Sequence, residues 1–305
     1  CVMSFKYTNP GYAELLSCGG TTVTGDQYSR TGVAFWQPRD MRGIQLDKVP
    51  LELYVKLDMY IEPPEHYGEI EFWGCLNRSF GIQLKSFSVG SWFMSGSANR
   101  QELSIGTNEI PIKTKEINTL WFRLKPGENK DGIFHVIFNG KELCNKQNLN
   151  FTFYKNEQTL TIYTSNNKLL ISSLIISDEK ISPREQVIML PVQATQTDMT
   201  DCGDGIYEAT AAGQELLQSV DVSSLISRYG GNSRVVSIVP FAKPAYRTAE
   251  GLCALTAIEK GGGTTTEHGR HIVTQDQNGF VMGAYDTSLS IADLAGRQFG
   301  WRAGT

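Results

Sequence analysis

The chain has 305 residues, of which 40% are hydrophobic and 20% are charged, and its formal net charge is −4. This balance argues against a nucleic-acid-binding protein, and no apolar run approaches the ~20 residues that a membrane-spanning helix needs. The charge is unevenly spread: residues 1–186 hold 20 basic and 20 acidic side chains, whereas residues 187–305 hold 8 and 12. We therefore expect two domains, at residues 1–186 and 198–305, joined by a linker at residues 187–197.

The first part has the pattern of an antiparallel β-sandwich. Residues 51–61 alternate apolar and polar side chains, which is the period of a strand with one buried face. Asn139–Gly140, between two such runs, is the strongest short hairpin signal in the chain. The other predicted strands are 68–74, 80–84, 86–93, 101–105, 119–124, 132–138, 150–154, 159–164 and 169–177. Many short strands separated by turn residues predict a sandwich or a barrel.

Four segments of this part, 119–127, 132–143, 159–163 and 170–179, resemble the second half of a concanavalin-A-like or laminin-G-like jelly roll. In that fold a strand led by Trp precedes a strand that ends in Asn-Gly, and a late strand ends in Ser-Asp-Glu. The resemblance covers roughly residues 30–182. It implies a jelly roll, a scaffold that hosts lectins, glycosidases and adhesion modules alike.

We consider next whether this sandwich carries catalytic or binding residues. Glu69 and Glu71 alternate on one strand, but Gly74 stands where glycosidases of this fold carry a third carboxylate. We therefore expect no catalytic residue and no enzyme. Sugar recognition would instead rest on exposed aromatic side chains, with a buried role in the core as the alternative. The candidate ligand-binding residues are Trp36, Tyr67, Trp73 and Trp92.

The second part is predicted to be another β-sandwich. Apolar runs at 234–242, 251–258, 270–274, 279–285 and 298–302 indicate strands, and residues 214–225 fit either a strand or a short helix. Residues 291–295 suggest one helical turn with Ser290 as its N-cap, and residues 261–263 suggest a loose glycine loop. The fold class expected for the whole chain is thus all-β, with two antiparallel sandwiches in tandem.

Several pieces of this second part resemble a sandwich domain of tailed-phage virion proteins. The matching segments are 235–239, 249–258, 262–265, 280–285 and 290–301. Residues 287–290 depart from that pattern, since they lack its usual Trp-Thr pair. The resemblance covers about residues 198–303, and it implies assembly or display.

The sequence predicts no metal site and no cofactor. His268 and His271 would diverge along an extended chain, so they form a polar edge more readily than a metal site. The acidic segment 198–205 lacks the ligand spacing of a calcium loop. The six cysteines show no zinc spacing, and reduced thiols are favoured over disulfides.

These observations predict a non-catalytic virion surface protein of the tail-fibre, decoration or appendage type, located on the exterior of the particle. Its first domain would bind a glycan or a host surface, and its partners would be other virion proteins and further copies of itself. The alternative is a bacterial cell-surface adhesin or carbohydrate-binding protein. A third possibility is a hydrolase that uses Glu69 and Glu71.

Overall fold

A computed structural model describes most of the backbone of the chain. The described residues are 6–11, 21–36, 44–45, 51–62, 68–74, 80–88, 91–98, 101–104, 112–151, 159–164, 169–244, 254–274 and 281–305. For strands β4, β6, β7, β8, β9 and β13 the description covers the backbone and its hydrogen-bonded register. The chain divides into two compact units, Cys1–Met189 and Leu190–Thr305.

Antiparallel sheets build both units, so the prediction of an all-β fold is confirmed. The first unit contains an eight-stranded sheet in the order β12-β11-β10-β5-β14-β3-β2, with β1 also paired to β14. Its strands are β1 (Lys6–Asn9), β2 (Thr21–Thr24), β3 (Val33–Trp36), β5 (Leu53–Ile61), β10 (Ile117–Lys125), β11 (Gly127–Phe138), β12 (Lys141–Phe151) and β14 (Leu169–Ser177).

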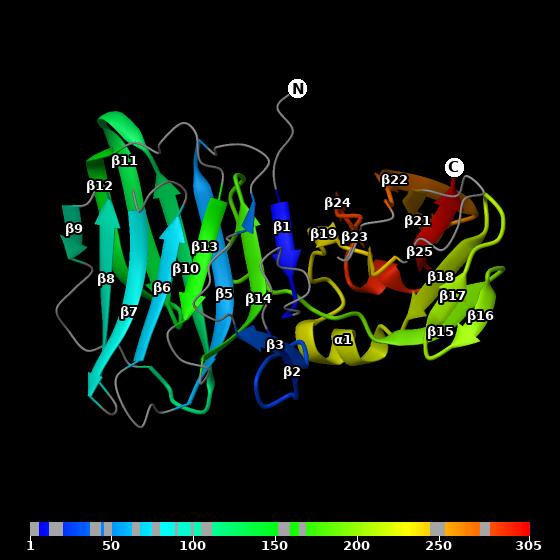
Figure 1. Cartoon of the computed structure of the whole chain (residues 1–305), viewed down its shortest axis with the longest axis horizontal. Coiled ribbons are helices and arrows are strands. Elements are labelled where there is room, and N and C mark those ends of the chain that lie inside the picture. Colours follow the sequence, from blue (N-terminus) through cyan, green and yellow to red (C-terminus); the bar gives the residue numbers. More distant parts are fainter. Residues whose placement is uncertain are drawn as a thin grey trace. The chain divides into compact units, whose positions relative to one another are not determined.

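The second layer of this unit is a six-stranded sheet in the order β4-β13-β6-β7-β8-β9. Its strands are β4 (Ile44–Gln45), β6 (Gly68–Gly74), β7 (Phe80–Ser88), β8 (Ser91–Ala98), β9 (Gln101–Ser104) and β13 (Thr159–Thr164). Figure 1 draws β6, β7 and β13 in front of β5, β10 and β11. Period-two alternation in the sequence of β7 predicts one apolar face, which is what a two-layer sandwich needs.

The Asn139–Gly140 hairpin is confirmed. Both residues have positive φ values, 49° and 77°, as a tight two-residue turn between β11 and β12 requires. The Asn139 side chain also ties the turn to β10. Its Oδ1 accepts a hydrogen bond from the Thr119 backbone N–H at 2.8 Å, and its Nδ2 donates to Asn118 Oδ1 at 2.9 Å.

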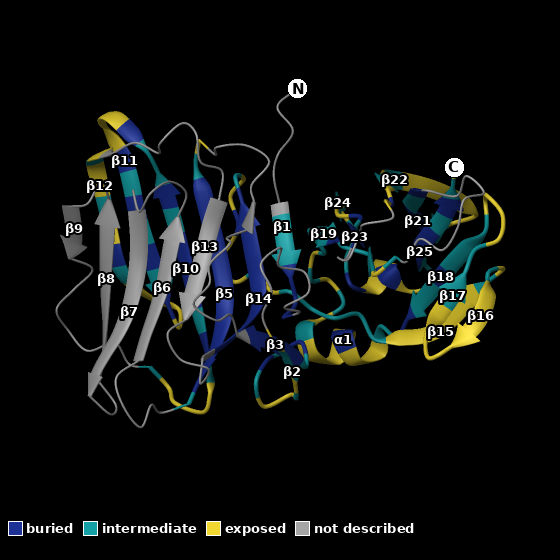
Figure 2. Cartoon of the chain, in the orientation of Figure 1, coloured by how far each residue is buried: buried dark blue, intermediate teal, exposed yellow. Residues whose placement is uncertain are grey.

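The central strand β5 differs from expectation, because all nine of its residues are buried (Figure 2). Alternation predicts one exposed face, yet Lys56 and Asp58 on that face are each only 1% exposed. Two segments that are remote in sequence cover it. Arg30 Nη1 donates to Asp58 Oδ2 at 2.7 Å, and Ile181 packs with Tyr54 in a small apolar cluster.

The second unit is organised around a five-stranded sheet in the order β15-β18-β25-β21-β22. Its strands are β15 (Val192–Thr197), β18 (Glu215–Val220), β21 (Ala254–Gly261), β22 (Thr264–Ile272) and β25 (Gln298–Gly304). Three two-stranded ladders accompany it: β16 (Thr200–Gly203) with β17 (Ile206–Glu208), β19 (Ser237–Ile238) with β24 (Tyr285–Asp286), and β20 (Phe241–Ala242) with β23 (Val281–Met282). The helices are α1 (Ser223–Tyr229) and a 3₁₀ turn, η2 (Ala292–Leu294).

Three local predictions in this unit need correction or refinement. Residues 214–225, predicted as either a strand or a short helix, contain one of each: strand β18 and then the start of helix α1. The glycines at 261–263 do not form a loose loop. Gly262 and Gly263 have positive φ values, and they form the tight turn of the β21–β22 hairpin. Val192–Thr197, within the predicted linker, forms β15, whose exposed polar residues resemble a linker in sequence.

Candidate functional site

Alternation in the strand sequences predicts that the six-stranded sheet of the first unit has one face richer in polar residues than the other. Along β7, Phe80, Ile82 and Leu84 alternate with Gly81, Gln83 and Lys85. Register extends both sets across the sheet, because residues paired on neighbouring strands share a face. We define the polar face by the positions Glu69, Glu71, Trp73, Gly81, Gln83, Lys85, Phe93, Ser95, Ser97, Glu102, Ser104, Thr159, Thr161 and Tyr163.

Two rows of this polar face have the composition of a sugar-binding surface. In one row Trp73 pairs with Gly81 on β7 and with Thr161 on β13. Glycine has no side chain, so the register places this tryptophan next to a position without one. In the next row Glu71 pairs with Gln83 and with Tyr163, which are residue types that form hydrogen bonds.

The predicted binding residues separate across the fold. By register Trp73 pairs with Gly81 and Thr161, whereas Trp92 pairs with Ser86 on β7. Trp36 ends β3 in the eight-stranded sheet, and Tyr67 lies outside the described residues. Glu69 and Glu71, considered for catalysis, share the polar face with Trp73.

Sequence reasoning missed Gln83 and Tyr163 as members of this site. The sequence of residues 80–85 could have identified Gln83, because large apolar residues alternate there with small or polar ones. Tyr163 gave no such signal. Its place beside Glu71 depends on the pairing of β13 with β6, which are about ninety residues apart in the chain.

The eight-stranded sheet does not offer a comparable surface at its centre. Tyr54, Trp121, Ile175 and Ile181 are buried together there, and Trp121 Nε1 donates a hydrogen bond to the Ile181 carbonyl at 3.1 Å. Trp121 also contacts His135 edge to face, with ring centroids 5.1 Å apart. Burial, followed by the Glu52 hydrogen bond, raises the pKa of Tyr54 to about 12.

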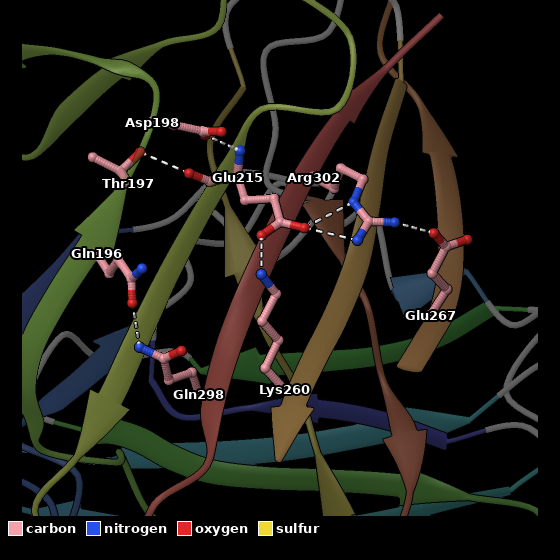
Figure 3. A network of polar contacts seen from close by, with 8 residues as sticks. All are labelled: Gln196, Thr197, Asp198, Glu215, Lys260, Glu267, Gln298 and Arg302. Atoms are coloured by element: carbon pink, nitrogen blue, oxygen red, sulfur yellow. Dashed lines mark hydrogen bonds and ion pairs between the residues drawn. The ribbon is translucent and has the colours of Figure 1, made fainter. Parts of the chain in front are cut away.

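A second polar surface lies on the five-stranded sheet of the second unit (Figure 3). Glu215 is at its centre: Oε1 accepts from Arg302 Nη2 at 2.7 Å, and Oε2 lies 2.5 Å from Lys260 Nζ. Arg302 also forms an ion pair with Glu267. Burial raises the pKa of Glu215, but the hydrogen bonds from Lys260 and Arg302 outweigh it and hold the pKa below its ordinary value. Opposite charges compensate one another, which is typical of a stabilising network.

Another cluster surrounds Glu259, which is buried on β21. Its carboxylate forms an ion pair with Arg297 and lies 3.4 Å from His268 Nε2. The His268 ring stacks on Tyr285 with centroids 3.4 Å apart and planes 3° apart. Burial and the nearby Glu259 carboxylate raise the pKa of Tyr285 strongly. The bulge at Ala257/Ile258 is the physical reason that His268 lies beside Glu259 rather than along a polar edge.

The candidate calcium and histidine sites do not form metal-binding groups in the described structure. Asp198 Oδ1 accepts from the Glu215 N–H at 2.5 Å, and Asp201 Oδ1 accepts from the Gly203 N–H at 2.8 Å, so both carboxylates stabilise turns. His271 lies against Trp301 instead of beside His268. Among the described residues, His, Cys, Asp and Glu form no group of three that could hold a metal ion. No helix in the described part of the chain is long and apolar enough to cross a membrane.

No protein-family model matches the chain, and no match was found among curated proteins. Solved structures do resemble it at low identity. An endo-β-1,4-glucuronan lyase from the fungus Trichoderma reesei is 10% identical, with a TM-score of 0.39 over 57% of this chain and 99% of its own. A SAP-like pentraxin from Limulus polyphemus is 13% identical, with a TM-score of 0.35 over 49% and 76%. The alginate lyase Aly36B is 11% identical, with a TM-score of 0.35 over 59% and 96%.

The prediction that the protein is not an enzyme is wrong as an exclusion, because lyases are among these similar structures. It rested on the missing third carboxylate at Gly74, which matters for hydrolysis by paired carboxylates. A lyase cleaves its polymer by elimination, so that absence does not exclude it.

Proposed function

We propose that the protein binds a glycan through the polar face of the six-stranded sheet. The observation that supports this proposal best is the row in which Trp73 pairs with Gly81 and Thr161. An aromatic position with a small neighbour suits stacking on a sugar ring, and the adjacent row of Glu71, Gln83 and Tyr163 supplies donors and acceptors for hydroxyl groups. All residues of β5 in the eight-stranded sheet are buried, so this strand offers no open surface for a sugar.

We also propose that the glycan-binding unit is displayed on the exterior of a virion, as part of a tail fibre, a decoration protein or another appendage. The resemblance of residues 198–303 to a tailed-phage sandwich domain supports this role. The partners would be other virion proteins and further copies of the chain, since such proteins assemble symmetrically. The alternative is a bacterial surface adhesin with the same first unit.

Glycan-array binding of the full chain tests the first proposal. We expect binding that Trp73→Ala lowers at least about fivefold, because each lost stacking contact contributes on the order of 1 kcal/mol or more. Leu51→Ala is the matched control, since Leu51 is an 87% exposed apolar side chain outside the polar face. Equal binding by wild type and Trp73→Ala would overturn the assignment of this face.

Cell fractionation tests the second proposal. Antibodies against the chain should label the outside of purified particles, and mass spectrometry should find the chain at a fixed ratio to other particle proteins. Recovery in the bacterial envelope fraction, with particles free of the chain, would favour the adhesin and overturn the virion role.

A further inference from the structure

The buried Lys56 of the eight-stranded sheet lies among side chains that a later segment of the chain covers. Its neighbours on the same face are one residue of its own strand and one on each adjoining strand: Tyr54, Trp121 and Ile175. These three side chains form one apolar cluster with Ile181, which follows β14 and is only 2% exposed. We call residues 178–189 the strap, because Ile181 closes this cluster from outside the sheet.

Two hydrogen-bond donors lie beneath the strap. Trp121 Nε1 donates to the Ile181 carbonyl at 3.1 Å. Lys56 pairs with Trp121 by register and is 1% exposed, and its Nζ has no hydrogen-bond partner among the described residues. The strap therefore satisfies the indole N–H but leaves the amine without an acceptor. Burial of an ammonium group in this way raises the free energy of the covered arrangement.

The carboxylates around Lys56 are engaged with other groups. Asp58 accepts hydrogen bonds from Arg30 Nη1 and from Thr119 Oγ1, both at 2.7 Å. Glu185 accepts one from a backbone N–H of the strap itself at 2.6 Å. A further acceptor beside Lys56 would thus supply the hydrogen bond that these two side chains do not give it.

The strap also shows which chemistry fits this position. Ile181 places a branched aliphatic side chain in the apolar cluster and a carbonyl oxygen on the Trp121 N–H. A ligand with an aliphatic group beside a carboxylate would supply both and would give Lys56 an acceptor as well. Hydrogen bonds between charged groups are the stronger ones, so such a ligand has an advantage that the neutral backbone of the strap lacks.

We propose that the strap is a lid over a binding site for a branched aliphatic carboxylate. The ligand displaces Ile181, its aliphatic group fills the cluster, and its carboxylate accepts hydrogen bonds from Lys56 and Trp121. Two sources carry this chemistry: the C-terminus of a peptide that ends in an aliphatic residue, and a free branched-chain acid. The site lies on the eight-stranded sheet, apart from the polar face proposed to bind a glycan.

Ligands that differ only in charge test the role of Lys56. One pair is acetyl-glycyl-isoleucine and its C-terminal amide, and the other is 3-methylpentanoate and 3-methylpentanamide. Isothermal titration calorimetry of the full chain should show at least one acid binding about tenfold or more tightly than its amide, because only the acid forms a charged hydrogen bond. The pair that binds identifies the source of the ligand.

Lys56→Met should bring acid and amide to within about threefold of each other, since the charged donor is gone. This ratio is independent of how firmly the strap is held, because both ligands must open it. Lys141→Met is the matched control, with the same change of charge at an exposed position, and it should keep the full preference. A preference that survives in Lys56→Met would overturn the assignment to this site.

Ile181→Ala tests the strap. It shortens the side chain that competes for the cluster, so acid and amide should both bind about threefold or more tightly than they bind the wild type. Ile206→Ala, at an exposed aliphatic position of the second unit, should change neither affinity. Hydrogen exchange of the strap amides in the wild type should become faster when the acid is bound. An unchanged affinity or an unchanged exchange rate would overturn the strap as a lid.

The remaining outcomes are equally distinct. If the wild type binds acid and amide equally, or if neither the wild type nor Ile181→Ala binds any of the four compounds, the inference is overturned. The proposed glycan binding is unaffected in both cases, because it is tested at Trp73 on the other sheet.

Discussion

At the scale of single residues, the most unusual position is Lys56. Its side chain is 1% exposed, and its Nζ has no hydrogen-bond partner among the described residues. Burial lowers the pKa of Lys56. The Asp58 carboxylate opposes that shift, the Arg30 guanidinium adds to it, and the Glu185 carboxylate opposes it. A buried ammonium group without a close partner is costly, so the amine destabilises the eight-stranded sheet.

Lys56→Met should therefore stabilise the first unit by about 1 kcal/mol or more, because methionine keeps the buried volume without the charge. In the wild type the folded state holds this proton less tightly than the unfolded chain does. Stability should thus rise with pH up to the ordinary lysine pKa, and Lys56→Met should flatten that rise. Hydrogen exchange of the β5 amides, compared at matched pH, measures both effects. Lower protection in the variant would contradict the argument.

Glu215 has the opposite pH dependence. Its pKa is held below the ordinary value, so its contribution to stability is present at neutral pH and is lost as pH falls through that lowered pKa. Glu215→Gln should cost about 2 kcal/mol at pH 7, since Lys260 and Arg302 lose their shared carboxylate. The difference should shrink in acid. Thermal unfolding followed by circular dichroism at pH 7 and in acid tests this, and a pH-independent cost would refute it.

At the scale of elements, the β11–β12 hairpin depends on one side chain. Asn139→Ala removes two hydrogen bonds and places alanine at a φ of 49°, so we expect a loss of about 2 kcal/mol. Asn139→Gly should lose less, because glycine tolerates the backbone angle. Urea denaturation gives the values, with the exposed Asn145→Ala as a control that should change little. If alanine and glycine proved equivalent, the backbone contribution would be disproved.

Strand β25 requires a glycine at its centre. A Cβ on Gly300 would lie 1.8 Å from the Leu216 carbonyl oxygen, whereas one on Gly304 would meet Ala254 Cβ at an ordinary 3.9 Å. Gly300→Ala should therefore destabilise the second unit by about 3 kcal/mol, and Gly304→Ala should be nearly neutral. Thermal unfolding of the two variants side by side provides the check. Similar melting temperatures would mean that the strand relaxes without cost.

The elements also show where sequence reasoning succeeds and where it stops. The alternation of β7 and the Asn139–Gly140 turn are local signals, and both correspond to observed structure. Burial of Lys56 has no local signal, because Arg30 and Ile181 come from distant segments to cover it. The candidate site depends on register in the same way. The residue type of Trp73 is enough to propose it as a binding residue. Its pairing with Thr161, and the pairing of Glu71 with Tyr163, follow from strand order.

At the scale of the whole molecule, the two units should unfold in separate transitions, since each has its own sheets and buried clusters. Differential scanning calorimetry should resolve two peaks. Asn139→Ala should lower the melting temperature of one peak, and Gly300→Ala that of the other. A single peak that both substitutions shift equally would show that the units unfold as one.

The hydrogen bond from Trp121 to Ile181 has a mechanical consequence. Residues 178–189 lead from β14 to the second unit, and Ile181 is held in the outer cluster of the eight-stranded sheet. Tension arriving through residue 190 would pull on Ile181 before it reached β14. The contacts of Ile181 with the apolar cluster around Trp121 would then break first, while the strands of the sandwich stayed paired.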